Sequence, residues 1–207
     1  MKKPAISLIG MGVGGLDGLS ARAFTAINES DLLIGHSRHL ELFAEYTGEK
    51  RLLGRLPELV QLLETTDRKT AVLASGDPLY FGVGRYLLQR LPKERITVFS
   101  NVSSVQYAFS LIKEPWDDAL VLSVHGRDLS AVLDQIMQAA KVCLLTDYKN
   151  SPKVIAKAIL QRTANDYTVW ICEDLGMDKE RCTCTTLQEL AGYNSSALNI
   201  LILQRAV

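Results

Sequence analysis

Short apolar runs alternate with helical patterns through the first half of the chain. The predicted strands are residues 5–9, 31–34, 70–74 and 96–99, and the predicted helices are residues 20–28, 57–65, 81–91 and 103–111. Strands that alternate with helices pair in parallel through right-handed crossovers. Residues 1–112 are therefore predicted to form an N-terminal parallel α/β domain.

The pattern changes at residues 113–118, where charged residues, a proline and Trp116 interrupt the apolar texture, and we interpret this segment as a linker. Beyond it, a helix is expected from Ser151-Pro152. Strands are predicted at residues 119–124, 142–146, 167–172, 181–185 and 197–203. Little helical pattern separates the last three strands, so partly antiparallel pairing is expected. Residues 119–207 are thus predicted to be a mixed-sheet α/β domain, with a cleft between the two domains as the binding place.

Two loops in the first domain have the composition of ligand-binding turns. The loop Gly10–Ser20 holds five of the 14 glycines of the chain, and glycine permits positive φ and close backbone approach. The second loop, Ser75–Pro78, ends a buried strand with a carboxylate and a proline. Strand ends of this kind expose backbone groups at the carboxyl edge of a sheet, where ligands bind. A plain turn in which Asp77 caps the next helix would have the same composition.

The glycine-rich loop does not predict a nicotinamide site. Gly10, Gly12 and Gly15 fit the GxGxxG pattern, which alone is a weak signal. The helix starts late, after Ser20, and the next strand ends in Gly35–Ser37 without an acid for a ribose hydroxyl. The loop therefore indicates a ligand other than a dinucleotide.

The charge balance and hydropathy narrow the range of partners. Lys and Arg number 23, as do Asp and Glu, so the net charge is zero. With no basic run, neither nucleic acid nor an anionic membrane is expected as a partner. No apolar run approaches the roughly 18–20 residues that span a bilayer, so we expect a cytoplasmic protein.

The four cysteines predict neither a disulfide framework nor a metal site. Cys143 and Cys172 lie in apolar runs and are expected to be buried thiols. Cys182 and Cys184 alternate on a predicted strand and so share one face. Two sulfurs without further Cys or His partners fall short of a zinc site, and no metal is expected.

With these loops placed, the chain resembles the tetrapyrrole methyltransferases of corrin and sirohaem synthesis, which use S-adenosylmethionine. Besides the glycine-rich loop, the matching segments are Ser75–Pro78, Asn101–Ser104, Glu173–Gly176 and Glu180-Arg181. The branch that methylates C5 of a precorrin is the most similar, on Gly35–Leu40, Ser123–Arg127 and Leu145–Asp147. The chain departs from the family at Ser100-Asn101, where related enzymes often carry Pro-Gly. Asn tolerates left-handed backbone better than most residues, so the turn is expected to survive.

The resemblance implies roles for residues of both domains. The implied cofactor-binding residues are Val13, Asp77, Tyr80, Ser103, Ser104, Thr146 and Leu175. The implied substrate-binding residues are Gly12, Gly14, Arg38, His125 and Arg127. A precorrin carries many carboxylates, which cationic side chains bind well. A solvated Arg38 and a structural His125 beside a turn are the alternatives. No general base is identified, since alignment and water exclusion can do most of the work for so electrophilic a methyl donor.

The resemblance also implies partners and leaves alternatives open. A precorrin or cobalt-precorrin is the expected substrate, and a homodimer is expected. Some enzymes of this branch carry a second, decarboxylating methyltransferase unit for which this chain has no room, so a separate C15-methyltransferase is expected in the same pathway. One alternative keeps the fold but changes the acceptor, as in diphthine synthase or a ribosomal-RNA ribose methyltransferase. The other is a non-catalytic subunit that holds a corrinoid.

Overall fold

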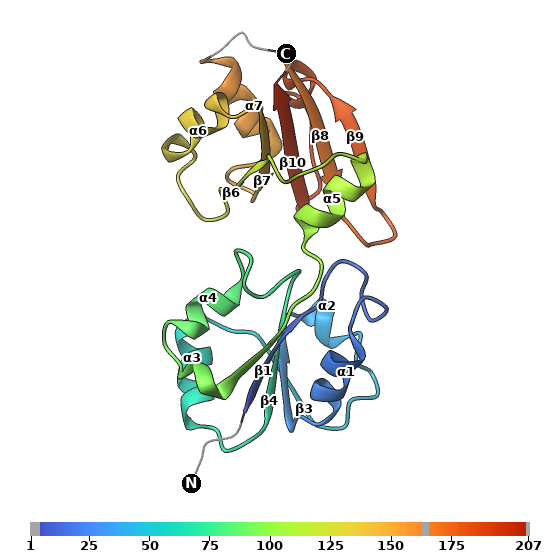
Figure 1. Cartoon of the computed structure of the whole chain (residues 1–207), viewed down its shortest axis with the longest axis vertical. Helices are drawn as coiled ribbons and strands as arrows, with labels where there is room; N and C mark the ends of the chain where they lie inside the picture. The colour runs from blue at the N-terminus through green and yellow to red at the C-terminus, as the bar shows by residue number, and fades with distance from the viewer. Residues whose placement is uncertain (1–4, 163–165, 206–207) are drawn as a thin grey trace. The chain divides into compact units, whose positions relative to one another are not determined.

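The computed structural model describes residues 5–162 and 166–205, and it divides into two compact units, residues 1–103 and 104–207 (Figure 1). The division precedes the linker expected at residues 113–118, because helix α5 (Ser104–Ile112) packs on strands of the second unit. Each unit contains one five-stranded sheet.

The first unit is a parallel sheet in the order β3-β2-β4-β1-β5. Its strands are β1 (Ile6–Gly10), β2 (Leu32–Gly35), β3 (Glu49–Leu52), β4 (Thr70–Ala74) and β5 (Ile96–Phe99). Its helices are α1 (Ala21–Asn28), α2 (Ser37–Leu40), α3 (Leu56–Thr65) and α4 (Val83–Leu88), with a short 3-10 turn η1 (Lys93–Arg95). The predicted parallel α/β architecture of this half is confirmed.

Helices cover both faces of this sheet, because successive strand residues point to opposite sides. On one face Leu8 and Val72 pack with Leu63 of α3 and Leu87 of α4. On the other face Ile9, Leu33 and Leu73 pack with Ile27 of α1 and Leu40 of α2. Figure 1 shows the two pairs of helices on opposite sides of the strands. With both faces buried, the carboxyl edge of the sheet is left for the loops.

The described residues of the second unit form a mixed sheet in the order β6-β7-β10-β8-β9, in which the β6–β7 pair is parallel and the other pairs are antiparallel. Its strands are β6 (Leu120–Ser123), β7 (Lys141–Leu145), β8 (Tyr167–Glu173), β9 (Arg181–Thr185) and β10 (Asn199–Arg205). Besides α5, its helices are α6 (Leu133–Gln138), α7 (Pro152–Leu160) and α8 (Leu187–Leu190), with the 3-10 turn η2 (Leu129–Ala131). The predicted antiparallel pairing of the last three strands is confirmed.

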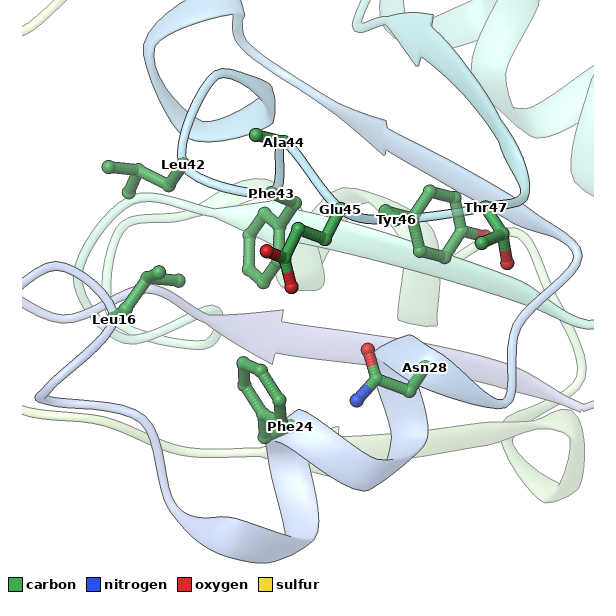
Figure 2. Close-up of a pocket in the computed structure, with 9 residues that line it drawn as sticks. All are labelled: Leu16, Phe24, Asn28, Leu42, Phe43, Ala44, Glu45, Tyr46 and Thr47. Carbon is green, nitrogen blue, oxygen red and sulfur yellow. The ribbon is translucent and has the colours of Figure 1, made fainter.

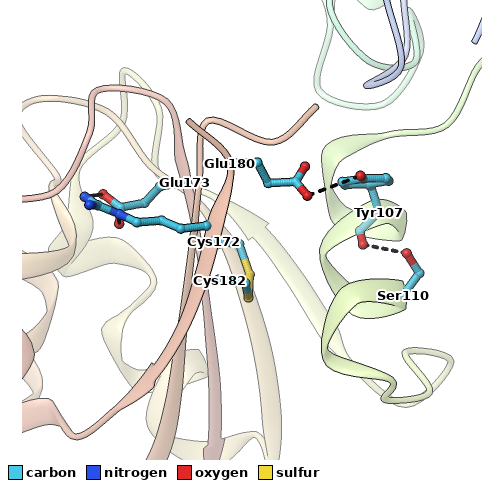
Figure 3. The surroundings of a disulfide bond; sticks show 7 residues. Tyr107, Ser110, Cys172, Glu173, Glu180 and Cys182 are labelled. Carbon is cyan, nitrogen blue, oxygen red and sulfur yellow. Dashed lines mark hydrogen bonds and ion pairs between the residues drawn. A yellow bond between two sulfur atoms is a disulfide. The ribbon is translucent and has the colours of Figure 1, made fainter. Parts of the chain in front are cut away.

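The structure corrects the expectation that Cys172 is a free thiol. Cys172 of β8 and Cys182 of β9 lie directly opposite each other in the antiparallel register, with Cα atoms 4.1 Å apart, and they form a disulfide (Figure 3). Cys143 is a buried free thiol, as expected, and burial raises its pKa far above the ordinary value. Cys184 is exposed.

The helices of residues 5–162 and 166–205 have at most ten residues each. None of those in residues 5–162 and 166–205 combines the length and apolar character that a membrane-spanning helix needs.

Candidate functional site

Three loops meet at the carboxyl edge of the first sheet, after β1, β4 and β5. The loop after β1 is tied to the loop after β4 through Met11 N–H, which donates to Ala74 O at 2.8 Å, and Gly12 N–H, which donates to Gly76 O at 3.1 Å. Both glycines have left-handed backbone, with φ of 63° at Gly12 and 58° at Gly76. The two glycine-bearing loops singled out in the sequence are therefore hydrogen-bonded neighbours.

Asn101, which follows β5, joins the third loop to the other two. Its Nδ2 group donates to Gly10 O at 2.9 Å and to Gly18 O at 3.0 Å. Its Oδ1 accepts from Val102 N–H at 2.8 Å, which fixes the start of the segment that leads into α5. One side chain thus holds both ends of the glycine-rich loop.

The carboxylate of Asp77 is a second link between the loops. Its Oδ1 accepts from Leu79 N–H at 2.8 Å and its Oδ2 accepts from Asn101 N–H at 3.3 Å. Helix α4 has Gly82, not Asp77, at its N-cap, so Asp77 does not have the helix-capping role considered as the alternative. Each oxygen keeps a lone pair for a further donor.

The close approach of these loops depends on Gly10. A Cβ at this position would lie 2.7 Å from Gly76 O and 2.9 Å from Pro78 Cδ. Gly14, by contrast, would have ordinary contact distances of 3.5 Å to Gly18. A Cβ at Gly12 would likewise lie 2.7 Å from the Asn101 side chain, so the crowding that requires glycine is at Gly10 and Gly12, whereas the loop is open at Gly14.

The remaining predicted residues of the first unit lie around this edge. Val13 is half-buried in the bend after Gly12. Tyr80 stacks edge-on against Phe81, with ring centroids 5.0 Å apart. Ser103 is 5% exposed, just before α5. Arg38 lies in α2, after β2, and its Nη2 donates to Ser75 Oγ at 2.9 Å. The structure thus brings the predicted substrate residue Arg38 to the loop that carries Asp77.

In the second unit, the turn after β6 is tied to the turn after β7. Gly126 N–H donates to Asp147 Oδ2 at 2.6 Å, and His125 Nδ1 lies 3.4 Å from Thr146 O. Backbone N–H groups of Asn150 and Gly126 hold the pKa of Asp147 below its ordinary value. Asn150 Nδ2 donates to the carbonyl of Arg127 at 2.9 Å. Three predicted residues, His125, Arg127 and Thr146, are therefore brought together.

Leu175 lies in the turn after β8, and a buried carboxylate organises this turn. Glu173, 0% exposed, accepts from Arg181 Nε at 2.7 Å, from Tyr193 Oη at 2.7 Å and from Ser196 N–H at 2.6 Å. Burial alone would raise the pKa of Glu173, but these donors outweigh it and hold the pKa below its ordinary value.

The same turn has further supports. Asp174 has positive φ, 48°, and accepts from Ser196 Oγ at 2.6 Å. Glu180 accepts from Gly176 N–H at 2.6 Å and from the Tyr107 hydroxyl of α5 at 3.4 Å, and Figure 3 shows Tyr107 facing Glu180. Ser104 begins the same helix. The resemblance included Glu173, but nothing in the sequence signalled its partners Tyr193 and Ser196.

A hollow of about 560 Å3 lies elsewhere in the first unit, between α1 and the segment 42–47. Figure 2 shows Phe24 of α1 facing Phe43 across it, and their ring centroids are 6.5 Å apart. None of the predicted cofactor or substrate residues lines this hollow. Within the described residues, no cluster of His, Cys, Asp or Glu could hold a metal ion.

The fold and the loops define a two-unit α/β protein whose first sheet presents a ligand-binding edge at the carboxyl ends of its strands. The model of the family Tetrapyrrole (Corrin/Porphyrin) Methylases matches residues 5–191. The chain belongs to this family and is a methyltransferase.

Curated relatives match along nearly the whole chain. The probable cobalt-precorrin-7 C(5)-methyltransferase of Methanocaldococcus jannaschii is 31% identical over 206 residues, which cover 95% of this chain and 96% of the relative. The cobalt-precorrin-7 C(5)-methyltransferase of Salmonella typhimurium is 31% identical, with 95% and 98% covered. The decarboxylating precorrin-6Y C(5,15)-methyltransferase of a Sinorhizobium species is 33% identical over 87% of this chain, but only 44% of that relative is covered.

The fold is also that of solved structures. The uroporphyrin-III C-methyltransferase of Thermus thermophilus, complexed with S-adenyl homocysteine, superposes with a TM-score of 0.75 at 21% identity, over 97% of both chains. The predicted two-domain tetrapyrrole methylase fold is therefore confirmed.

Proposed function

We propose that this chain transfers the methyl group of S-adenosylmethionine to C5 of cobalt-precorrin-7 or of its cobalt-free equivalent, in cobalamin biosynthesis. The observation that carries this proposal is the full-length similarity to two cobalt-precorrin-7 C(5)-methyltransferases. The loops joined by Asp77 and Asn101 lie at the carboxyl edge of the first sheet, which is consistent with a cofactor site there.

The residues at this edge fit the proposed cofactor. Asp77 has acceptor capacity left on both oxygens for the hydroxyl or ammonium groups of the cofactor. We propose that Val13, Tyr80 and Ser103 bind beside it, and that Ser104, Thr146 and Leu175 of the second unit also contact the cofactor. When bound, S-adenosylmethionine supplies a methyl group that is already a strong electrophile. The protein then orients the two reactants and excludes water, and this alignment lowers the barrier by several kcal/mol.

The proposed acceptor carries many carboxylates, and the proposal assigns them to cationic and hydrogen-bonding groups. Arg38, His125 and Arg127 are the proposed contacts, with Gly12 and Gly14 lining the approach of the ring. We also propose that a separate decarboxylating C15-methyltransferase acts in the same pathway, that this chain forms a homodimer and that it is cytoplasmic. The C(5,15)-methyltransferase relative, which extends well beyond this chain, supports the first of these.

Mass spectrometry of the corrinoid tests the reaction directly. The purified protein is incubated with cobalt-precorrin-7 and methyl-labelled S-adenosylmethionine, and we expect one labelled methyl group on the ring. If RNA or protein is added as a competing acceptor and takes up the labelled methyl group while the corrinoid does not, another acceptor is favoured. Cofactor that binds but never transfers its methyl, even with the decarboxylating protein present, would favour a subunit that only holds the corrinoid.

Asp77→Asn tests the cofactor assignment. The amide keeps one acceptor for the Leu79 N–H group but replaces the second carboxylate oxygen by a donor. We expect binding of S-adenosylhomocysteine to weaken about tenfold, the effect of losing one charge-assisted hydrogen bond. Calorimetry measures this affinity. Asp67→Asn, an exposed carboxylate that precedes β4 at the opposite edge, is the control. Equal affinities of the two variants would refute the assignment.

Arg38→Ala tests the substrate assignment. We expect the KM for cobalt-precorrin-7 to rise about tenfold or more, because a cation that faces a carboxylate is lost. The affinity for S-adenosylhomocysteine should stay within about twofold of the unsubstituted protein. If calorimetry shows equal losses for both ligands, Arg38 does not belong to the substrate contacts.

A further inference from the structure

The guanidinium of Arg38 is fixed at two points by neutral groups. Its Nε donates to Nε2 of His39 at 3.3 Å, and its Nη2 donates to Oγ of Ser75 at 2.9 Å. His39 comes next in α2, whereas Ser75 follows β4, the neighbour of β2 in the sheet. A long, flexible side chain is thereby held in one orientation at the carboxyl edge.

Within the described part of the chain, the Arg38 cation has no counter-ion. Among residues 5–162 and 166–205, no carboxylate forms an ion pair with Arg38, and its Nη1 group makes no hydrogen bond. The side chain is nevertheless half-buried, and burial lowers its pKa. Removing a cation from water without a partner is costly, so a fixed and unpaired guanidinium is typical of a site for an anion.

The imidazole of His39 accepts the hydrogen bond from Arg38. The residue is 8% exposed, and its Nε2 faces a permanent donor, so the ring proton must be on Nδ1. Nδ1 is buried and has no hydrogen-bond partner among the described residues. Burial, followed by the charges of Arg38 and His36, lowers the pKa of His39 to about 4. The ring therefore stays neutral near pH 7 and can orient the guanidinium without competing for the anion.

We propose that Arg38, His39 and Ser75 form a preorganised receptor for one carboxylate of the tetrapyrrole, in which Arg38 binds the anion and His39 and Ser75 are positioning residues. The proposal rests on the proposed function for the identity of the ligand. It deepens that function by naming which group orients the cation. A fork-shaped guanidinium whose other donors are occupied offers its remaining N–H groups in a fixed plane, which suits a carboxylate.

A set of single and double variants tests the receptor. The readouts are the KM for cobalt-precorrin-7 and the dissociation constant for uroporphyrin I, a stable polycarboxylate ring. We expect His39→Leu and Ser75→Ala each to weaken uroporphyrin binding about fivefold, as for the loss of one hydrogen bond. In the Arg38→Ala background, His39→Leu should have no further effect, because His39 acts only through Arg38. Lys93→Ala, at the opposite edge of the sheet, is the control for loss of a surface cation.

Thermal unfolding separates positioning from a structural role. Leu at position 39 fills the site and removes a buried donor that has no partner, so the Tm of His39→Leu should not fall below that of the unsubstituted protein. A variant that unfolds no earlier but binds the ring more weakly can only have lost orientation. A lower Tm with unchanged binding would overturn the proposal.

Other outcomes distinguish the receptor from the proposed function. Additive effects of His39→Leu and Arg38→Ala would overturn the receptor, as would absence of uroporphyrin binding by the unsubstituted protein. Parallel loss of S-adenosylhomocysteine affinity would also overturn it, because the carboxylate bound would then be that of the cofactor. If cobalt-precorrin-7 is not methylated but uroporphyrin binding follows the expected order, the receptor stands and the proposed function fails.

Discussion

Replacing Glu173 by glutamine is expected to lower the free energy of unfolding by about 2–3 kcal/mol, because a buried carboxylate with several donors becomes an amide that cannot accept from all of them. Arg181, Tyr193 and Ser196 N–H all donate to the two oxygens of Glu173. One oxygen becomes an NH2 group that faces these donors. Chemical denaturation of the two proteins at pH 7 measures the difference.

The matched control is Glu180→Gln in the same turn. Glu180 is partly exposed and accepts from Gly176 N–H and the Tyr107 hydroxyl, so water can replace part of what is lost. We expect a cost below about 1 kcal/mol. If Glu173→Gln and Glu180→Gln lower the free energy of unfolding by the same amount, the hydrogen bonds to Glu173 do not make the larger contribution to stability that we expect.

The contribution of Glu173 to the free energy of unfolding should also decrease as the pH falls. The pKa of Glu173 is lower in the folded chain than its ordinary value, so the unfolded chain takes up a proton first as the pH falls. The stabilisation is complete above the unfolded-state pKa of about 4.3 and is lost as the pH falls through the folded-state pKa. The stability gap between the unsubstituted protein and Glu173→Gln should therefore narrow below about pH 4. A gap that widens on acidification would contradict this.

The buried elements could be predicted from the sequence because burial is what the hydrophobic pattern records. Strands β1, β2 and β4 are apolar on both faces and were all predicted. Strand β3, with the sequence EKRL, was missed because every one of its residues is exposed, and it forms only by pairing with β2. The short helices α2, α6 and α8 gave too few turns for a periodic signal.

The site was predictable to the extent that its chemistry is local. The glycine-rich and Gly-Asp-Pro loops have compositions that indicate ligand contact, and the structure joins them by hydrogen bonds. The supporting residues could not be found in this way. His39 matters through its contact with Arg38, and Asn101 through contact with Gly10, which lies 91 residues away. The facing pair Cys172 and Cys182 likewise requires the register of β8 and β9, which composition does not give.

We expect substitutions of Asn101 to disrupt the proposed cofactor site at the carboxyl edge of the first sheet, and Asn101→Asp should be more damaging than Asn101→Ala. Alanine removes the bonds to Gly10 O, Gly18 O and Val102 N–H, at a cost of about 2–3 kcal/mol in unfolding free energy. Aspartate keeps the acceptor for Val102 N–H but sets a charged oxygen against two carbonyl oxygens, so it should be worse than alanine. We expect kcat/KM for S-adenosylmethionine to fall about 100-fold in Asn101→Asp.

The order of Asn101→Ala and Asn101→Asp in stability and cofactor affinity is the test. If Asn101 merely filled space, the isosteric aspartate would be tolerated better than alanine. Denaturation curves and cofactor titrations of both variants measure the order. Asn28→Asp is the control, since this residue ends α1 away from the loops, and it should change neither measurement by more than about twofold. If Asn101→Asp is closer to the unsubstituted protein than Asn101→Ala, the Nδ2 bonds to the glycine-rich loop do not hold it. The loop would then keep its shape through the backbone hydrogen bonds of Met11 with Ala74 and of Gly12 with Gly76.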